Sequence, residues 1–242
     1  MFFSFKDFLS AEDAARFFEL THAAQVAKVA AYLEFLGQQP VAAHFGASPR
    51  ASSSFARKSS SRPRGQTAQD ESSAAEPVLT EEDEFILQEL INGRTRSGFG
   101  AFGTESGVLP QKELSLAVAE VCGEIGHEYV VERPRRSGEA PTLNSRSFFF
   151  YWCHAEKQKL VDIRRKLDRL HTHEHTERRR GLWQHIVIVV DRAMCPDCIA
   201  FAACLARSEQ IFLAMEDPAW LRVFPPDAEQ SAQLLPLHRA TS

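Results

Sequence analysis

Residues 184–209 read QHIVIVVDRAMCPDCIAFAACLARSE, and this stretch decides how the chain folds. Its first part, Gln184 to Asp191, is a β-branched run without polar alternation, which is typical of a strand buried on both faces of a sheet. Its last part, Cys198 to Glu209, is rich in alanine and predicts a helix. A buried strand followed within a few residues by a helix is one unit of a layered α/β domain.

The flanking sequence extends this pattern in both directions. Helices are expected at 80–91, 110–125 and 155–170, and a polar loop at 171–181. Strands are expected at 128–133, 146–152, 211–215 and 221–224. The first two strands predict an antiparallel hairpin with a long loop. The order helix, hairpin, helix, strand, helix and two strands predicts an α/β layered sheet and excludes a helical bundle or a β-sandwich.

Composition divides the chain into four segments. Residues 1–40 read as helical, with a capping box at Ser10–Asp13 and an apolar stripe that must dock on the main domain or on a protein partner. Residues 41–79 are rich in Ser, Pro and Arg, which predicts a disordered linker. Residues 80–227 are expected to form the compact domain, and residues 228–242 a C-terminal tail.

The overall composition limits the class of protein. The chain has 242 residues, of which 44% are hydrophobic and 25% charged, as in ordinary globular proteins. Five cysteines are an odd number and too few for a secreted disulfide framework. The first ten residues lack the pattern of a signal peptide, and no apolar run is long enough for a spanning helix. We therefore expect an intracellular protein, cytoplasmic or nuclear, that is neither secreted nor embedded in a membrane.

Charge is distributed unevenly along the chain. The formal net charge is −4, yet residues 133–180 contain 13 Lys and Arg against 6 Asp and Glu. A locally basic stretch inside an acidic chain predicts a polyanionic partner at one face. The alternative is a helix face whose charges are merely solvated.

Two short motifs carry the chemistry: His154-Ala155-Glu156 and Cys195-Pro196-Asp197-Cys198. One histidine and two thiolates supply three zinc ligands and leave the fourth tetrahedral position to water, as in catalytic zinc sites. Glu156 can lie beside the metal without binding it and act as general acid and base. Both cysteines fall at a helix start, where backbone N–H groups stabilise thiolates. The sequence thus predicts one catalytic zinc ion per chain.

The motifs also allow other interpretations. A Cys-Pro-x-Cys step after a strand also resembles glutaredoxin-type redox pairs, but a redox pair leaves the His-x-Glu motif unexplained. A zinc site that serves folding alone is a second alternative. The glycines at 98–103 match GxGxxG, yet no strand precedes them, so a loop is expected. Alternating histidines at 171–175 lie in a charged stretch that favours an exposed loop.

His-x-Glu followed by Cys-x-x-Cys resembles the signature of the zinc-dependent cytidine deaminase superfamily. A closer resemblance is to the DYW-type deaminase domains of organellar RNA-editing proteins and their fungal relatives, over about Glu113 to Pro226. It rests on Cys153–Lys157, on Cys195–Cys198, and on two final strands with no room for a helix between them. Ile199 stands where the plant domains place a histidine of a second zinc site, which agrees with a single zinc ion.

The resemblance implies a cytidine-deaminase-like three-layer α/β fold with a central mixed sheet, to which an N-terminal helical appendage is added. It also implies hydrolysis of cytosine to uracil, with zinc held by His154, Cys195 and Cys198 and with Glu156 moving protons. The basic stretch favours single-stranded RNA or DNA over a free nucleoside. A free cytidine or nucleotide deaminase and a non-catalytic, zinc-stabilised nucleic-acid-binding module are the alternatives. The candidate contacts to substrate phosphates and bases are Arg178, Arg179, Arg180, Phe149 and Tyr151.

Overall fold

The computed structural model describes residues 5–38, 52–59, 79–98, 106–128, 143, 152–169, 176–227 and 233–236. Its helices are α1 (Phe5–Phe8), α2 (Ala11–Arg16), a 3-10 turn (Phe17–Glu19), α3 (His22–Gly37), α4 (Glu81–Ile91), α5 (Gln111–Glu124), α7 (Ala155–Arg169), α8 (Thr176–Trp183) and α9 (Pro196–Glu209). Its strands are β1 (Ser53–Lys58), β2 (Thr95–Arg96), β3 (Ile186–Val190), β4 (Leu213–Glu216), β5 (Trp220–Phe224) and β6 (Gln233–Pro236).

The strands form one mixed sheet in the order β2-β1-β3-β4-β5-β6. Strands β3 and β4 run parallel, as expected for two strands joined by the crossover helix α9. The other neighbouring strands are antiparallel, including the close pair β4 and β5. The sequence prediction of an α/β fold with a central mixed sheet is therefore confirmed.

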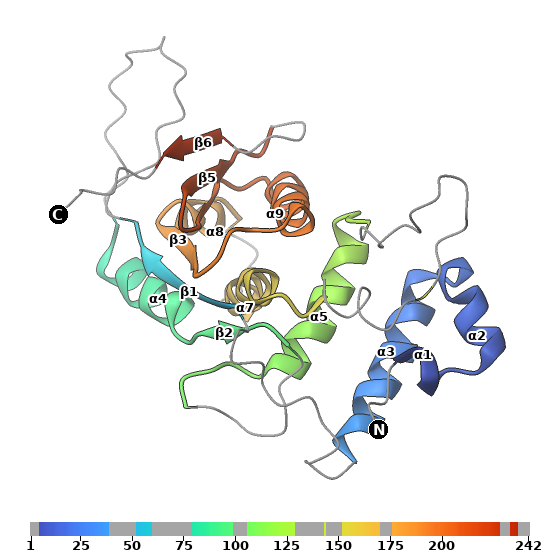
Figure 1. Ribbon diagram of the computed structural model, residues 1–242. Helices are drawn as coiled ribbons and strands as arrows, with labels where there is room; N and C mark the ends of the chain where they lie inside the picture. The colour runs from blue at the N-terminus through green and yellow to red at the C-terminus, as the bar shows by residue number, and fades with distance from the viewer. Residues whose placement is uncertain are drawn as a thin grey trace.

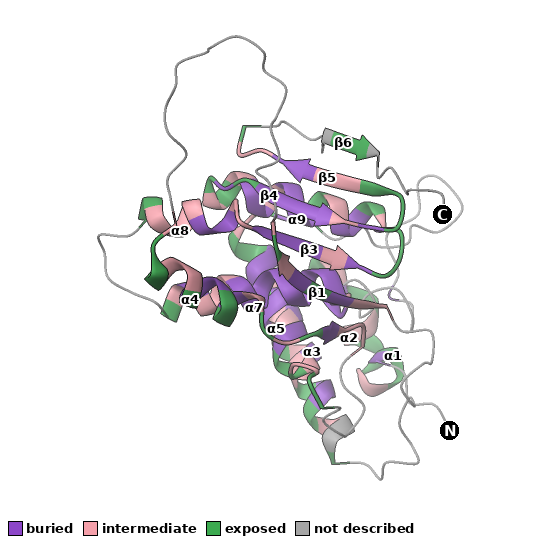
Figure 2. Ribbon diagram, turned by 90° about the vertical axis from the view of Figure 1, so that its left-hand side faces the viewer, coloured by how far each residue is buried: buried purple, intermediate pink, exposed green. Residues whose placement is uncertain are grey.

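The helices form layers beside this sheet. Helices α5, α7 and α9 lie on one face, and α1 to α3 lie beyond α5 (Figure 1). Figure 2 looks onto the sheet with α7 and α9 behind it, and shows that buried residues follow the strands and the inner sides of these helices. The core at this interface is fully buried at Ile188 on β3, Leu160 on α7 and Phe201 on α9.

The N-terminal helices dock on α5 of the main domain, which is one of the two alternatives that the apolar stripe predicted. Val29, Tyr32 and Leu33 of α3 are buried in the common core. The His22 ring contacts the carbonyl oxygen of Ala119, and Gly123 leaves room for that ring. Ser10 caps α2 by accepting a hydrogen bond from the Asp13 N–H at 3.0 Å. Appendage and sheet therefore share one packed interior.

The prediction that residues 41–79 are a disordered linker is wrong for residues 53–58. These form β1, which pairs with β3 from Ser54↔Val190 to Lys58↔Ile186 and with β2 on its other side. Ser54 is fully buried, and its hydroxyl donates to the Val189 carbonyl at 3.0 Å. Backbone hydrogen bonds to β2 and β3 stabilise this Ser-rich strand, which has little apolar surface to bury. The sheet therefore begins well before Thr80.

Two further expectations need correction. Residues 233–236 of the expected C-terminal tail form β6 on the sheet edge, and residues 176–181 of the expected polar loop belong to helix α8. The predicted hairpin at 128–133 and 146–152 falls almost wholly outside the described residues. No helix in the described part of the chain has both the length and the apolar character needed to cross a membrane.

Candidate metal and catalytic site

Strand β2 and the two residues that follow it hold the first turn of α7, where the His-x-Glu motif lies. The Ser97 hydroxyl accepts a hydrogen bond from the Ala155 N–H at 3.0 Å, and the Thr95 hydroxyl donates to the Ala155 carbonyl at 2.7 Å. The side-chain amide of Gln158 donates to the carbonyls of Gly98 and Cys153, both at 3.0 Å. His154 thus sits on a helix start that neighbouring backbone and side chains hold in place.

The two cysteines begin helix α9. Cys195 is its N-cap, and its sulfur accepts a hydrogen bond from the Cys198 N–H at 3.4 Å. Pro196 occupies the first helical position, where a missing N–H is harmless. Just before the cap, the Met194 N–H donates to the Asp217 carboxylate at 3.4 Å. The sequence predicted both cysteines at a helix start, and the structure places them there.

The structure brings His154, Cys195 and Cys198 together. The three potential ligand atoms lie within 4.8 Å of one another. His154 Nδ1 is 3.2 Å from Cys198 Sγ and 3.5 Å from Cys195 Sγ. In a tetrahedral zinc site with bonds of about 2.0–2.3 Å, ligand atoms are separated by roughly 3.5 Å. This His/Cys/Cys group could therefore hold a metal ion, and its donor set fits zinc.

The charge states of the two thiols also suit a cation. Hydrogen bonding from Cys198 lowers the pKa of Cys195 to about 4, with a further contribution from His154. Burial, reinforced by the neighbouring Cys195, raises the pKa of Cys198 well above its ordinary value. One thiolate forms readily, whereas the second requires nearby positive charge. A divalent ion bound between them would supply that charge.

Glu156 lies in the first turn of α7, two residues after His154. Glu156 is 5% exposed, and its Oε2 atom has no hydrogen-bond partner among the described residues. Burial raises the pKa of Glu156 above that of an ordinary glutamic acid. A buried carboxyl oxygen with no protein partner is available to exchange protons with another group at the site.

A buried ionic cluster includes one residue inside the Cys-x-x-Cys motif and one directly after the His-x-Glu motif. The Lys157 ammonium pairs with Oδ2 of Asp197, and Oδ1 of Asp197 is 3.1 Å from Nε2 of His127. Burial alone would raise the pKa of Asp197, but the hydrogen bond with His127 and the charge of Lys157 lower it to about 2. Sequence reasoning missed these three residues; Lys157 and Asp197 were visible inside the motifs, but His127 is distant in sequence.

The described part of the basic stretch is largely neutralised by ion pairs within the fold. Of the basic residues described between Lys157 and Arg180, all except Arg169 form ion pairs with acidic side chains. Arg178 pairs with Asp83 of α4 at 2.7 Å, and Arg179 pairs with Asp168 at 2.6 Å. These pairs tie α8 to its neighbours, which explains why a charged segment forms a helix there.

The other residues singled out from the sequence lie outside the metal-binding group or outside the described residues. Arg180 pairs with Glu177 on α8, while Phe149, Tyr151 and the alternating histidines lie outside the described residues. Cys153 is buried and Cys204 is partly buried, neither within the metal-binding group. The expectation that no strand precedes the glycine stretch is wrong, because β2 ends two residues before Gly98; the Gly98 carbonyl accepts from the Gln158 side chain.

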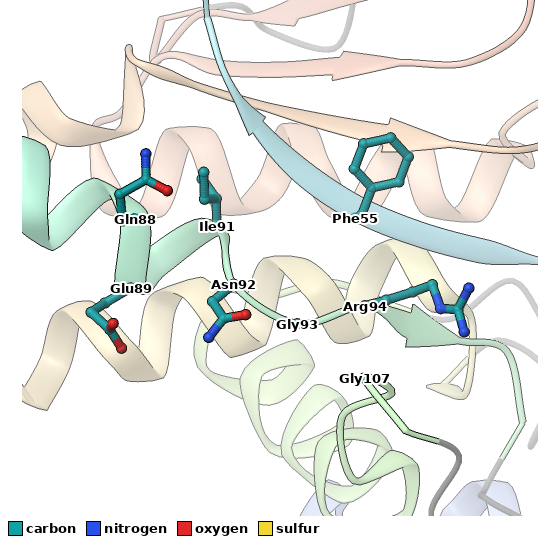
Figure 3. Close-up of a pocket in the computed structure, with 8 residues that line it drawn as sticks. All are labelled: Phe55, Gln88, Glu89, Ile91, Asn92, Gly93, Arg94 and Gly107. Atoms are coloured by element: carbon teal, nitrogen blue, oxygen red, sulfur yellow. The ribbon is translucent and has the colours of Figure 1, made fainter.

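A shallow cleft lies apart from the metal-binding group, at the junction of α4, β1 and β2 (Figure 3). Its volume is about 560 Å³, and Phe55, Ile91, Glu89 and Arg94 are among its lining residues. Neither His154, Glu156 nor the two motif cysteines line it. The cleft is therefore not where the predicted chemistry takes place.

Part of the chain matches the model of one protein family. The family described as single-strand DNA deaminase toxin A, C-terminal, matches residues 94–160, well under half of the chain. The matched stretch includes His154 and Glu156, and the two cysteines lie beyond it. No curated protein matches the chain. The match supports a nucleic-acid deaminase, and the likeness to the DYW type stays a prediction.

Proposed function

We propose that this protein is a zinc-dependent hydrolytic deaminase that converts cytosine to uracil in single-stranded nucleic acid. One observation carries the proposal: His154, Cys195 and Cys198 meet within 4.8 Å at the starts of two helices, with the buried Glu156 two residues from His154. The matched family is named for action on single-stranded DNA, so DNA is the first substrate to test.

In the proposed reaction, water adds to C4 of cytosine, the C4–N4 bond breaks, and ammonia leaves. His154, Cys195 and Cys198 would hold the zinc ion, which when bound lowers the pKa of a coordinated water. Glu156 would take up the two protons of the water one after the other at its unpartnered Oε2, passing the first to the ring nitrogen as the C4–O bond forms and the second to the departing amine as the C4–N4 bond breaks. Burial favours the protonated form of Glu156, so the residue can hold a proton between these transfers.

The substrate contacts form a second part of the proposal. Arg178, Arg179 and Arg180 are candidates for phosphate contacts, and Phe149 and Tyr151 for stacking on a base. Each of the three arginines already pairs with an acidic side chain, so binding a phosphate there would exchange one anionic partner for another. The base must be single-stranded or extruded, because C4 is inaccessible within a stacked duplex.

The test is to incubate the purified chain with single-stranded DNA, single-stranded RNA and free cytidine, and to measure uracil by sequencing or chromatography. We expect uracil in a polymer substrate and about one zinc ion per chain by elemental analysis. Two tightly held zinc ions would contradict the single site. Zinc-loaded protein that converts none of the three substrates would favour the non-catalytic binding module.

Replacement of Glu156 separates the chemistry from the fold. Glu156→Ala should keep zinc and thermal stability but lose activity by about 10²–10⁴-fold, since general acid–base groups contribute on that scale. His154→Ala should instead lose the metal, and with it stability, because metal binding is coupled to folding. Near-parental deamination by Glu156→Ala would refute the assigned role.

A further inference from the structure

Three buried side chains form a polar cluster that the proposed chemistry does not use. The side chains of Lys157, Asp197 and His127 are 0%, 2% and 2% exposed. The Lys157 ammonium pairs with one carboxylate oxygen of Asp197, and the His127 ring lies 3.1 Å from the other. Both oxygens of the buried carboxylate are therefore engaged, each by a different part of the chain.

The cluster lies where the two motifs meet. Lys157 directly follows Glu156 in the first turn of α7, and Asp197 lies between Cys195 and Cys198 in the first turn of α9. Their ion pair consequently joins the two helix starts that carry the proposed ligands. His127 follows α5, and its backbone N–H is held by the Cys122 carbonyl at 2.9 Å. Three separate elements thus converge on one carboxylate.

The Phe201 ring packs against two members of the cluster. Phe201 is fully buried on α9, one helical turn after Asp197. The Lys157 Nζ atom lies 5.4 Å from the centre of the Phe201 ring, within the range of a cation–π contact. The His127 and Phe201 rings are 5.5 Å apart at an interplanar angle of 87°, an edge-to-face arrangement. Phe201 therefore contacts both groups that bind the Asp197 carboxylate.

A second buried lysine of α7 shows what is particular about Lys157. Lys159 is equally buried, but its Asp162 partner lies three residues further along the same helix. Its other hydrogen bonds go to the carbonyls of Asn92 and Gly93, away from both motifs. Replacing a buried ion pair by apolar residues often leaves stability unchanged. A contribution to stability therefore does not explain why the Lys157–Asp197 pair joins the two motifs.

We propose that Lys157, Asp197 and His127 are positioning residues, which fix the first turn of α7 against the first turn of α9 and so set the spacing of His154, Cys195 and Cys198. The inference rests on the proposed function only in taking zinc as the ion at this group. Groups that orient metal ligands from the next layer of contacts typically change metal affinity or activity by about 10–100-fold when removed.

The test compares Lys157→Met with the matched control Lys159→Met in the full chain. In each variant the aspartate keeps a second partner, His127 for Asp197 and Lys166 for Asp162. Zinc affinity is measured by chelator competition, ligand geometry by the visible spectrum of the cobalt-substituted protein, and stability by thermal unfolding. Lys157→Met should bind zinc about 10–100-fold more weakly and show an altered cobalt spectrum. Lys159→Met should lose stability but keep parental zinc affinity and the parental spectrum.

Parental zinc affinity and spectrum in a folded Lys157→Met variant would overturn the proposal. Should that variant fail to fold, Lys157→Met combined with Asp197→Leu removes both charges and avoids an unpaired buried carboxylate. If the double variant folds, it should still bind zinc weakly, and parental affinity would overturn the proposal. If the double variant also fails to fold while Lys159→Met folds, the cluster serves folding and the positioning role is wrong. A parent that binds zinc but forms no uracil refutes the proposed function and leaves this comparison intact.

Discussion

Asp217 offers a sharp test of how the loop before Cys195 is held. Its side chain is fully buried and accepts five hydrogen bonds. One oxygen accepts from the N–H groups of Ala219 and Trp220, each at 2.9 Å. The other accepts from Nε and Nη2 of Arg222 and from the Met194 N–H. We predict that Asp217→Asn strongly destabilises the fold, because the amide NH₂ would face the guanidinium and a backbone donor.

The magnitude follows from the burial of this pair. Arg222 is only 13% exposed, so removing the charge of Asp217 leaves a buried guanidinium without its counter-ion. Breaking such a pair from one side costs about 3–5 kcal/mol. The free energy of unfolding of a whole domain is only about 5–15 kcal/mol. At about 2–4 °C per kcal/mol for a chain of this size, the melting temperature should fall by roughly 6–20 °C.

The assay is urea denaturation followed by circular dichroism, with thermal melting as a second measure. Glu19→Gln is the control, because its ion pair with Arg16 is 65% exposed on both sides. Exposed pairs contribute about 0–1 kcal/mol, so this variant should stay close to the parent. An Asp217→Asn variant that loses no more stability than Glu19→Gln would refute the view that this carboxylate holds the turn.

Two further predictions concern pH and salt. Burial would raise the pKa of Asp217, but hydrogen bonds from Ala219, Arg222, Trp220 and Met194 outweigh that effect and lower it. The ionised carboxylate therefore contributes to stability at pH values above about 4, the pKa of an unfolded aspartate, and this contribution is lost as the pH falls below 4. In Asp217→Asn, the urea midpoint should consequently depend less on pH below about 4 than in the parent. Replacing Arg178–Arg180 with Ala should leave zinc bound but weaken the salt dependence of the affinity for single-stranded DNA. The slope of log affinity against log salt concentration should become shallower by about 0.7 for each phosphate that these arginines neutralise. An unchanged slope would show that α8 does not contact the DNA.

Much of the fold could be predicted because local signals agreed with the tertiary structure. Helix α4 begins at Glu81, close to the expected start at Thr80, and Thr80 forms a reciprocal capping box with Asp83 there. Helices α5, α7 and α9 and strand β3 fall close to their expected positions. In each case an apolar face or an unbroken β-branched run coincides with a buried position in the core.

The errors arose where stability comes from distant partners. β1 has few apolar residues, and it is a strand because β2 and β3 pair with its backbone on both sides. α8 carries consecutive charged residues from Glu177 to Arg180, and pairs such as Arg178 with Asp83, 95 positions earlier, stabilise it. The three proposed ligands could be found because their spacing is local within each motif. His127 could not, because only the folded chain brings it to Asp197.

The position of β1 also determines when the sheet can form. Ser54 bonds to Val189, which lies 135 positions later in the chain, so β1 emerges from the ribosome long before its partner exists. At roughly 5–20 residues per second, the nascent strand waits for about 7–27 seconds before β3 is available. Cys195 and Cys198 come later still, so the metal-binding group can assemble only after β3 and the start of α9 have been synthesised.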